Sequence, residues 1–163
     1  MRTRAATMVA SVGVVLAGCG GGDGEPTPAG HAVRARVIRV IDGDTIEVSI
    51  AGSVEDVRYI GVDTPETVKP GTPVQCYGPQ ASAENHRLVG GRAVRLVFDR
   101  ERRDTYGRLL AYVHAGSRFV NAALVRRGYA RTLTIPPNTA HASLLRRLEA
   151  GAGQDGRGLW GAC

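Results

Sequence analysis

Alternation of apolar and polar residues with a period of two recurs in several short segments of the chain and predicts β-strands. Between positions 33 and 41 apolar residues alternate with arginines, which indicates a half-buried strand with a basic outer face. The ranges 46–50 and 54–62 have strand character, and the short connection between them contains glycine and predicts a hairpin. Apolar runs at 94–98 and 109–113 complete the set of predicted strands.

The apolar period changes to that of a helix in three later segments. A helix is expected over 77–89, because a proline lies at its first turn and two glycines follow its end. A second helix is expected over 119–127, and a third is expected to be capped by Asn138 or Thr139 and to end at Gly151. Five short strands with a helix between the third and the fourth are typical of the OB-fold. The predicted fold class is therefore α+β, a five-stranded OB-fold β-barrel with three α-helices.

The first 18 residues have the features of a targeting signal. Two arginines precede an apolar run that is too short to cross a membrane as a helix. The run ends in Leu-Ala-Gly-Cys, with the cysteine at Cys19, and this resembles a bacterial lipobox, in which the cysteine carries the lipid. We expect residues 1–18 to be a lipoprotein signal peptide. An ordinary secretory signal with a chance cysteine is the alternative.

The rest of the chain divides into a tether and one domain. Residues 19–32 begin at the lipidated cysteine and are rich in glycine and proline, which is typical of a flexible linker. Residues 33–163 are enough for one domain with one modest core. We therefore expect an extracytoplasmic lipoprotein that is anchored to the cell membrane through its lipid alone.

The charge of the chain adds a weak preference for polyanionic partners. The formal net charge is +6, from 21 basic and 15 acidic residues. Only Lys69 among the basic residues is a lysine, so a compositional bias toward arginine explains this charge equally well. The histidines lack the spacing of metal ligands and are interpreted as surface or packing residues.

Candidate chemistry is concentrated at the open end of the predicted hairpin. Asp42 and Asp44 precede its first strand. Asp63 and Glu66 follow its second strand, so the hairpin brings these carboxylates together with Arg58. Oxygen ligands without a thiol or imidazole suit Ca²⁺ or Mg²⁺ better than Zn²⁺, and an arginine beside such a cation suits a phosphate diester. Taken singly, each acidic residue also fits a turn or a loop cap.

Three motifs carry a resemblance to a known family. They are Asp-Gly-Asp-Thr at 42–45, Arg-x-x-x-Val-Asp-Thr-Pro-Glu at 58–66 and Asp-x-Tyr-Gly-Arg at 104–108. In these motifs the chain resembles the staphylococcal nuclease (thermonuclease) family, and the resemblance extends from about Val33 to Trp160. It implies the same OB-fold arrangement and a nuclease that cleaves both DNA and RNA, leaving 3′-phosphates and 5′-hydroxyls.

The resemblance also implies a Ca²⁺ cofactor and its ligands. Asp44, Asp63 and the main-chain carbonyl of Thr64 are expected to hold the ion, with Asp42 nearby. Glu66 is expected to orient or deprotonate the attacking water; whether it is a true general base stays open.

The resemblance assigns the remaining roles to residues that contact the phosphate. Arg58 and Arg108 are expected to bind the phosphate and to stabilise the transition state, and Tyr106 to contact the substrate phosphate. Turn packing is the alternative for Tyr106. We expect a monomer that meets nucleic acid as its substrate and touches the membrane only through the lipid.

Two departures from the family pattern concern substrate binding. The stretch 132–137 contains no aromatic residue where the type member of the family has two tyrosines, and Thr105 replaces a lysine. These changes put affinity and base preference in question and leave the chemistry in place. A non-catalytic nucleic-acid-binding OB-fold lipoprotein is the alternative function, and a lipoprotein that binds small phosphorylated ligands is a third.

Two cysteines remain once Cys19 is lipidated. Because the mature chain is expected outside the cytoplasm, where disulfides persist, Cys76 and Cys163 are predicted to form one. Such a bond would fasten the C-terminal tail near the start of the first helix. Two unrelated thiols are the alternative.

Overall fold

The computed structural model describes residues 30–68 and 70–163. The predicted signal peptide, the lipidation site Cys19 and all of the tether up to residue 29 lie outside the described residues. Within the described part, no helix combines the length and the apolar character that crossing a membrane requires.

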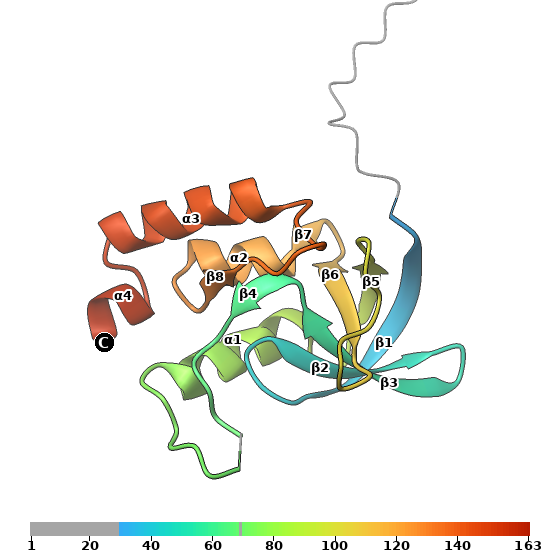
Figure 1. Cartoon of the computed structure of the whole chain (residues 1–163). Coiled ribbons are helices and arrows are strands. Elements are labelled where there is room, and N and C mark those ends of the chain that lie inside the picture. Colours follow the sequence, from blue (N-terminus) through green and yellow to red (C-terminus); the bar gives the residue numbers. More distant parts are fainter. Residues whose placement is uncertain (1–29, 69) are drawn as a thin grey trace, which may run out of the picture.

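Five strands close into a mixed β-barrel, which confirms the predicted OB-fold (Figure 1). They are β1 (Ala32–Val40), β2 (Thr45–Ile50), β3 (Ser53–Tyr59), β5 (Ala93–Val97) and β6 (Leu109–Ala115). Neighbours pair antiparallel in the order β3-β2-β1-β5-β6, and the parallel pairing of β3 with β6 closes the barrel. The two-residue strand β7 (Arg118–Phe119) pairs antiparallel with the last two residues of β6.

The predicted strand over 54–62 is wrong as one element, because the chain leaves the barrel after Tyr59. The strand β4 (Gly61–Asp63) pairs instead with β8 (Arg131–Leu133) in a separate two-stranded sheet. Gly61 has a φ of +79°, a conformation that favours glycine and redirects the backbone. A Cβ at this position would also lie 2.5 Å from Leu145 Cδ1.

A buried amide side chain supports this change of direction. Asn121 is inaccessible to solvent, and its Oδ1 accepts a hydrogen bond from the Val113 N–H at 2.9 Å. Its Nδ2 donates to the carbonyl of Ile60 at 2.8 Å, at the residue between β3 and β4. The Asn121 side chain thus supplies hydrogen-bond partners to the Val113 N–H and the Ile60 carbonyl, two buried backbone groups near the point where the chain leaves the barrel.

Helix α1 (Gly78–Val89) lies over one end of the barrel, α2 (Val120–Arg126) packs against its side at β6, and α3 (Ala142–Gln154) packs on α2 (Figure 1). The prediction that Asn138 or Thr139 caps α3 is wrong, because His141 is the N-cap residue. Asn138 is buried and holds the backbone of Glu101, accepting from its N–H and donating to its carbonyl at 2.8 Å each. Its side chain is therefore used in a tertiary contact, and α3 begins four residues later and runs past Gly151. A short fourth helix, α4 (Leu159–Ala162), follows.

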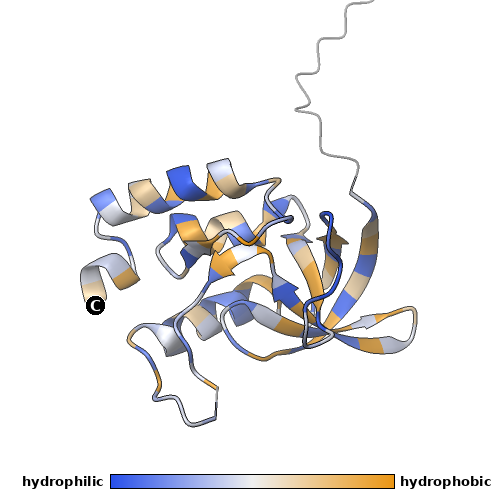
Figure 2. Ribbon diagram, viewed as in Figure 1, coloured by the Kyte–Doolittle hydropathy of each residue, from blue (hydrophilic) through white to orange (hydrophobic). Residues whose placement is uncertain are grey.

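Apolar side chains fill the barrel and the space beneath α2, as the apolar colouring of these elements in Figure 2 illustrates. Val37, Ile46, Val57, Leu96 and Val113 are at most 2% exposed. The loop that follows β5, by contrast, is strongly hydrophilic. The predicted alternation in the strands is thus the alternation between the core and solvent.

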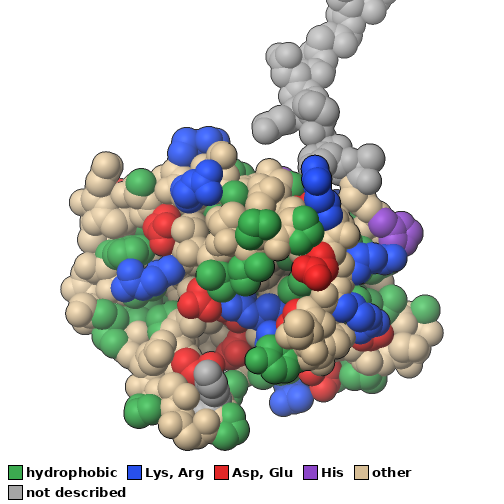
Figure 3. Space-filling view, in the orientation of Figure 1, with side chains coloured by type: hydrophobic (Ala, Val, Ile, Leu, Met, Phe, Trp, Pro, Cys, Tyr) green, Lys and Arg blue, Asp and Glu red, His purple; other side chains and the backbone are tan. Residues whose placement is uncertain are grey.

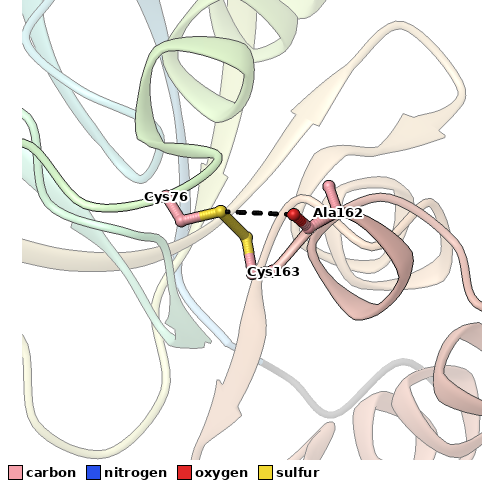
Figure 4. The surroundings of a disulfide bond; sticks show 3 residues. All are labelled: Cys76, Ala162 and Cys163. Atoms are coloured by element: carbon pink, nitrogen blue, oxygen red, sulfur yellow. Dashed lines mark hydrogen bonds between the residues drawn. A yellow bond between two sulfur atoms is a disulfide. The ribbon is translucent and has the colours of Figure 1, made fainter.

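The structure joins Cys76 and Cys163 by a disulfide, which confirms the predicted pairing (Figure 4). Their Cα atoms are 6.0 Å apart, and 87 positions separate them in the sequence. The bond fastens the segment before α1 to the residue that follows α4.

Candidate active site

A tight turn between β1 and β2 presents the first acidic residues. The N–H groups of Ile41 and Asp42 both donate to the carbonyl of Thr45, and Asp42 Oδ1 accepts from the Asp44 N–H at 2.9 Å. This local bond from an aspartate side chain to the backbone two residues later is typical of an Asx turn. It fixes the direction in which Asp44 leaves the backbone.

Gly43 lets the two ends of the hairpin approach each other closely. A Cβ at this position would lie 2.6 Å from Thr64 Oγ1 and 2.7 Å from both carbon atoms Cβ and Cγ2 of Thr64. Real side chains do not make such contacts, so the glycine is required by space. Thr64 therefore sits directly against the Asp42–Thr45 turn.

The Asp44 carboxylate is the most enclosed group of the site, with the residue only 4% exposed. Its Oδ2 accepts from the Thr64 N–H at 2.8 Å and from Thr64 Oγ1 at 3.0 Å. The Nη1 of Arg58 lies 2.9 Å from the same oxygen. Oδ1 accepts only from Thr45 Oγ1, at 3.2 Å, among the described residues.

Burial dominates the titration of Asp44. It raises the pKa of Asp44 to about 7, and Asp42 adds to the rise, although Arg58 and the two hydrogen bonds from Thr64 act in the opposite direction. A raised pKa means that the ionised form lacks compensating positive charge. A cation beside the carboxylate would lower this pKa and keep Asp44 ionised.

Arg58 holds the two arms of the hairpin together through both ends of its guanidinium. Nη1 donates to the Val62 carbonyl at 2.8 Å, and Nη2 donates to Asp63 Oδ1 at 3.0 Å. The Arg58 side chain is 15% exposed, whereas that of Asp63 is 56% exposed. The arginine is therefore fixed, and the carboxylate at its outer end faces solvent.

Arg108 enters the site from the turn that precedes β6. Its Nε donates to Asp104 Oδ2 at 2.8 Å, and its backbone N–H donates to Asp104 Oδ1 at 3.0 Å. The terminal nitrogens Nη1 and Nη2 donate to no group in the described part of the chain. Asp104 therefore orients the guanidinium and leaves its outer edge available for a ligand.

Two further contacts hold this turn in place. Arg103 pairs with Glu55 on β3 and donates to the carbonyl of Gly107 at 2.6 Å. A solvent-exposed charged turn is the simplest interpretation of the run 99–104, but Arg103 is paired with a carboxylate of the barrel. Tyr106 is 84% exposed, with the Arg108 guanidinium carbon 5.5 Å from the centre of its ring.

One pocket of about 180 Å³ gathers the predicted site residues. Acidic and basic side chains lie next to each other around a hollow in the middle of the face in Figure 3. The residues that line the pocket are Asp42, Asp44, Thr45, Arg58, Asp63, Thr64, Glu66 and Arg108. The exposed Tyr106 lies outside it and lines neighbouring pockets.

The prediction that Asp44, Asp63 and the Thr64 carbonyl hold a metal ion stays a prediction. In the described residues, no three His, Cys, Asp or Glu side chains are arranged as a metal site. The pocket nevertheless offers only oxygen donors, because neither histidine nor cysteine lines it. Oxygen donors of carboxylates and carbonyls, completed by water, are the set that Ca²⁺ takes.

Glu66 follows β4 in the loop that leads to α1. Its Oε1 accepts from the N–H groups of Thr67 and Val68, both at 2.8 Å. Its own N–H donates to Gln75 Oε1 at 2.9 Å, and its carbonyl accepts from the Gln75 N–H at the same distance. Glu66 is thus held at the edge of the pocket by several bonds.

A second, larger pocket of about 360 Å³ adjoins the first and shares Arg58 and Arg108 with it. Its lining includes Leu110, Leu133 and Ile135, and Ile135 is 60% exposed. The stretch 132–137, which contains no aromatic residue, therefore supplies the aliphatic side chains of Leu133 and Ile135 to this pocket.

Sequence reasoning missed the support beneath the site. Asn85 is inaccessible to solvent, and its Nδ2 donates to the Asp42 carbonyl at 2.9 Å. Its Oδ1 accepts from the hydroxyl of the buried Tyr59, also at 2.9 Å. Because Asn85 lies on α1, far along the chain, no local pattern could have linked it to the turn. Asp104, which supports Arg108, could have been found from the sequence, because it is the first residue of the Asp-x-Tyr-Gly-Arg motif at 104–108.

A family model and several curated relatives match most of the chain. The family described as "Staphylococcal nuclease homologue" matches residues 56–162. A thermonuclease of Staphylococcus intermedius is 44% identical over 142 residues, which are 85% of this chain and 84% of the relative. A thermonuclease of Staphylococcus hyicus is 44% identical over 125 residues, which are 77% and 74% of the two chains. Endonuclease YncB of Bacillus subtilis is 44% identical over 130 residues, or 78% and 62%.

The family match begins within β3 and ends within α4, and the two thermonucleases cover more than three quarters of the chain. The extent of the match and the closed barrel agree with each other and with the motifs. The chain therefore belongs to the staphylococcal nuclease family.

Proposed function

We propose that the chain is a calcium-dependent nuclease that hydrolyses phosphodiester bonds of DNA and RNA, leaves 3′-phosphates and is tethered outside the cell by a lipid. The coarser assignment, a nuclease and hence a hydrolase of ester bonds, follows from the family. The single observation that carries the proposal is the pocket in which two arginines face four carboxylates.

The charge of this pocket favours a divalent cation. Four carboxylates and two guanidiniums line it, which leaves a formal charge of −2 when all are ionised. A phosphodiester is itself an anion, so it would be repelled from the site without a compensating charge. One divalent cation neutralises the pocket, and the raised pKa of Asp44 is consistent with the same deficit of positive charge.

Asp44, Asp63 and the carbonyl of Thr64 would hold this cation, with Asp42 nearby. When bound, Ca²⁺ would supply Lewis-acid stabilisation of charge on the phosphate and a site for water. The donor set consists of oxygens alone, and the exposed Asp63 leaves room for water ligands. We propose that the site binds Ca²⁺ more tightly than Mg²⁺.

The two arginines would bind the phosphate from opposite sides of the pocket. Arg108, with both Nη nitrogens available, provides the bidentate fork that matches two phosphate oxygens. Arg58 is fixed by Asp44, Asp63 and the Val62 carbonyl, so its charge is already in place as the five-coordinate transition state forms. Glu66, at the edge of the pocket, would accept a proton from the attacking water or orient that water.

The neighbouring pocket is the candidate site for the nucleoside. It shares both arginines with the catalytic pocket, and Leu110, Leu133 and Ile135 give it an apolar surface. Aliphatic side chains bury a base without the stacking that aromatic rings provide. We therefore propose weak discrimination between bases, with Tyr106 in contact with the substrate phosphate.

A non-catalytic nucleic-acid-binding lipoprotein is the competing function. A binding module would benefit from arginines, but it has no use for a nearly buried aspartate whose carboxylate repels the phosphate. The placement of Asp44 beside Arg58 therefore favours catalysis.

Incubation of the purified chain with plasmid DNA and with RNA tests the proposal. Cleavage is expected in Ca²⁺, little in Mg²⁺ and none in EDTA, and the products should carry 3′-phosphates that a phosphatase removes. Asp44→Ala should abolish cleavage, whereas Asp56→Ala, a change at an exposed acid on β3, should not. Retention of nucleic acid without cleavage would favour the binding module, and undiminished cleavage in EDTA would exclude the cation.

Membrane anchoring is tested separately from activity. Cys19→Ser should release the protein from the membrane fraction or block its processing, because a lipid-modified cysteine with several acyl chains gives stable anchoring. Wild-type protein that is wholly in the medium, without a lipid adduct in its mass spectrum, would contradict the anchor and leave the nuclease assignment intact.

A further inference from the structure

Glu66 lies in a segment that has little structure of its own. The segment 64–77 connects β4 to α1, and its described residues, all but residue 69, contain no helix or strand. Its middle is exposed, including the apolar residues Val68 and Val74, at 53% and 61%. Loops of this length without regular structure are usually functional or mobile, and Glu66 is only half-buried, so its position depends on hydrogen bonds as well as on packing.

Gln75 closes this segment into a loop directly at Glu66. The Gln75 side chain accepts from the Glu66 N–H, and the Gln75 N–H donates to the Glu66 carbonyl, both at 2.9 Å. Both hydrogen-bonding groups of the Glu66 backbone are thus held by one residue. The carboxylate of Glu66 in turn accepts from Thr67 and Val68, so the orientation of the side chain follows that of the backbone.

Gln75 is itself exposed, and its position is fixed through its neighbour along the chain. Cys76 is bound covalently to Cys163, after α4, with 6.0 Å between the Cα atoms. Helix α4 is anchored by Leu159, which is 2% exposed and whose N–H donates to the Gly128 carbonyl at 2.8 Å. A continuous path of bonds therefore leads from the packed helices through the disulfide to Gln75 and Glu66.

We infer that Gln75 is the positioning residue for Glu66, and that the Cys76–Cys163 disulfide makes this positioning dependent on the oxidised state of the protein. The inference rests on the proposed function, in which Glu66 acts on the attacking water. Gln75 contacts neither the pocket that would hold the cation nor the apolar pocket beside it. Its loss should therefore affect the chemical step and spare binding.

The test compares Gln75→Ala with two matched variants. Gln75→Glu retains an oxygen that accepts from the Glu66 N–H, and Gln80→Ala removes an exposed glutamine from α1. Gln75→Ala should lower kcat between about 10-fold and 10²-fold, because a small misplacement of a reacting group has effects of this size, with KM and calcium affinity within about twofold. Gln75→Glu should recover most of kcat, and Gln80→Ala should match the wild type.

A measurement without turnover separates this inference from the proposed function. Hydrogen exchange at the Glu66 amide should be faster in Gln75→Ala than in the wild type and normal in Gln80→Ala. If the wild-type protein cleaves no nucleic acid, the proposed function fails while this exchange experiment still reports on Gln75. Wild-type kcat in Gln75→Ala, or a loss confined to KM, would overturn the inference.

Reduction tests the contribution of the disulfide. Cys163→Ser, and the wild type in a thiol reductant, should lose kcat in the same way as Gln75→Ala, and reductant should leave Cys163→Ser unchanged. The combination of Gln75→Ala with Cys163→Ser should lose little more than either change alone, because both act on one path. Unaltered kcat and unaltered Glu66 exchange after complete reduction would overturn the redox part of the inference.

Discussion

The Nη1 atom of Arg58 lies 2.9 Å from Oδ2 of Asp44, and both side chains are largely removed from solvent, at 15% and 5% exposure. The pair joins the strand β3 to the turn before β2, so it links the two arms of the hairpin at their open end. Charge pairs with this degree of burial are costly to break, because the remaining partner is left uncompensated. Arg58 consequently stabilises the site structurally, at the same place where we propose that it acts in catalysis.

Replacement of Arg58 by lysine should separate these roles. Lysine keeps the charge but cannot contact Asp44, Asp63 and the Val62 carbonyl at once, so kcat should fall by about 10²–10³. Arg39→Lys is the control, since Arg39 is paired with Glu47 on the surface. Nuclease assays at saturating Ca²⁺ measure the effect, and equal kcat in the two variants would contradict the assignment.

Asp104 should matter through Arg108. Asp104→Ala removes the acceptor of Arg108 Nε and of two backbone N–H groups, and a drop in activity of about tenfold or more is expected from the misplaced guanidinium. Arg108→Lys should lose more, about 10²–10³ in kcat, because the fork itself is absent. Asp56→Ala, which removes an exposed acid on β3, serves as the control. A fully active Arg108→Lys variant would mean that this arginine does not touch the reacting phosphate.

Gly43→Ala should damage the site by steric overlap alone. The added methyl group would have to displace Thr64, and such overpacking destabilises by about 1–3 kcal/mol. Calcium affinity should fall too, because the Thr64 carbonyl is a proposed ligand. Urea unfolding and calcium titration measure both effects.

Gly151→Ala provides the opposite result for comparison. Gly151 lies in α3, and a Cβ added there would meet no atom within 4 Å outside the backbone of its own helix. Alanine should therefore stabilise the protein by about 0.5–1 kcal/mol. Equal effects of the two substitutions would show that the approach of Gly43 to Thr64 is not constrained.

Acid stability should depend on His114. Burial, together with Arg95 and His141, lowers the pKa of His114 from 6.5 to about 4. Between these two values the unfolded chain binds the proton and the folded protein does not, so the free energy of unfolding should decrease as the pH falls from about 6.5 to about 4.

His114→Phe removes the titrating group and retains a ring that can stack on Phe119. The decrease in stability over this pH range should therefore be smaller in this variant than in the wild type. His31→Gln, at an exposed position, should follow the wild-type curve. Parallel curves for His114→Phe and the wild type, from urea unfolding at several pH values, would contradict the role of His114.

The disulfide should contribute strongly to stability. It closes a loop of 87 positions, for which the loop-entropy relation gives roughly 4–5 kcal/mol as an upper value. Urea unfolding of Cys76→Ser should therefore show a lower midpoint than the wild type, and reductant should lower the wild-type midpoint to that of the variant. Coincident unfolding curves before and after reduction would show that the bond adds no stability.

The sequence predicted those parts of the site that depend on local geometry. A hairpin brings its two ends together, and the motif residues Asp44, Arg58 and Asp63 stand at these ends, so their meeting followed from chain direction alone. The disulfide followed from counting cysteines. The barrel followed from alternation, which is a local property of each strand.

What could not be predicted depends on contacts between distant segments. Asn138 has the composition of a helix cap, yet it binds the Glu101 backbone across the fold. Asn85 and Gln75 are ordinary polar residues by sequence and acquire their roles only from Asp42 and Glu66. The end of β3 depends on the positive φ of Gly61, which no apolar pattern records.

The parallel pairing of β3 with β6 has a consequence for how the protein tolerates change. Arg58 is in register with Leu110, two positions after Arg108, so the spacing of the two arginines is set across paired strands. Insertions or deletions in the connections between these strands can alter their length without moving either guanidinium. A shift of β6 by a single residue, however, would exchange its inward and outward faces and remove Arg108 from the pocket that it shares with Arg58. The connections can therefore vary in length without loss of function. Within β6, by contrast, the alternation of inward and outward side chains must be kept.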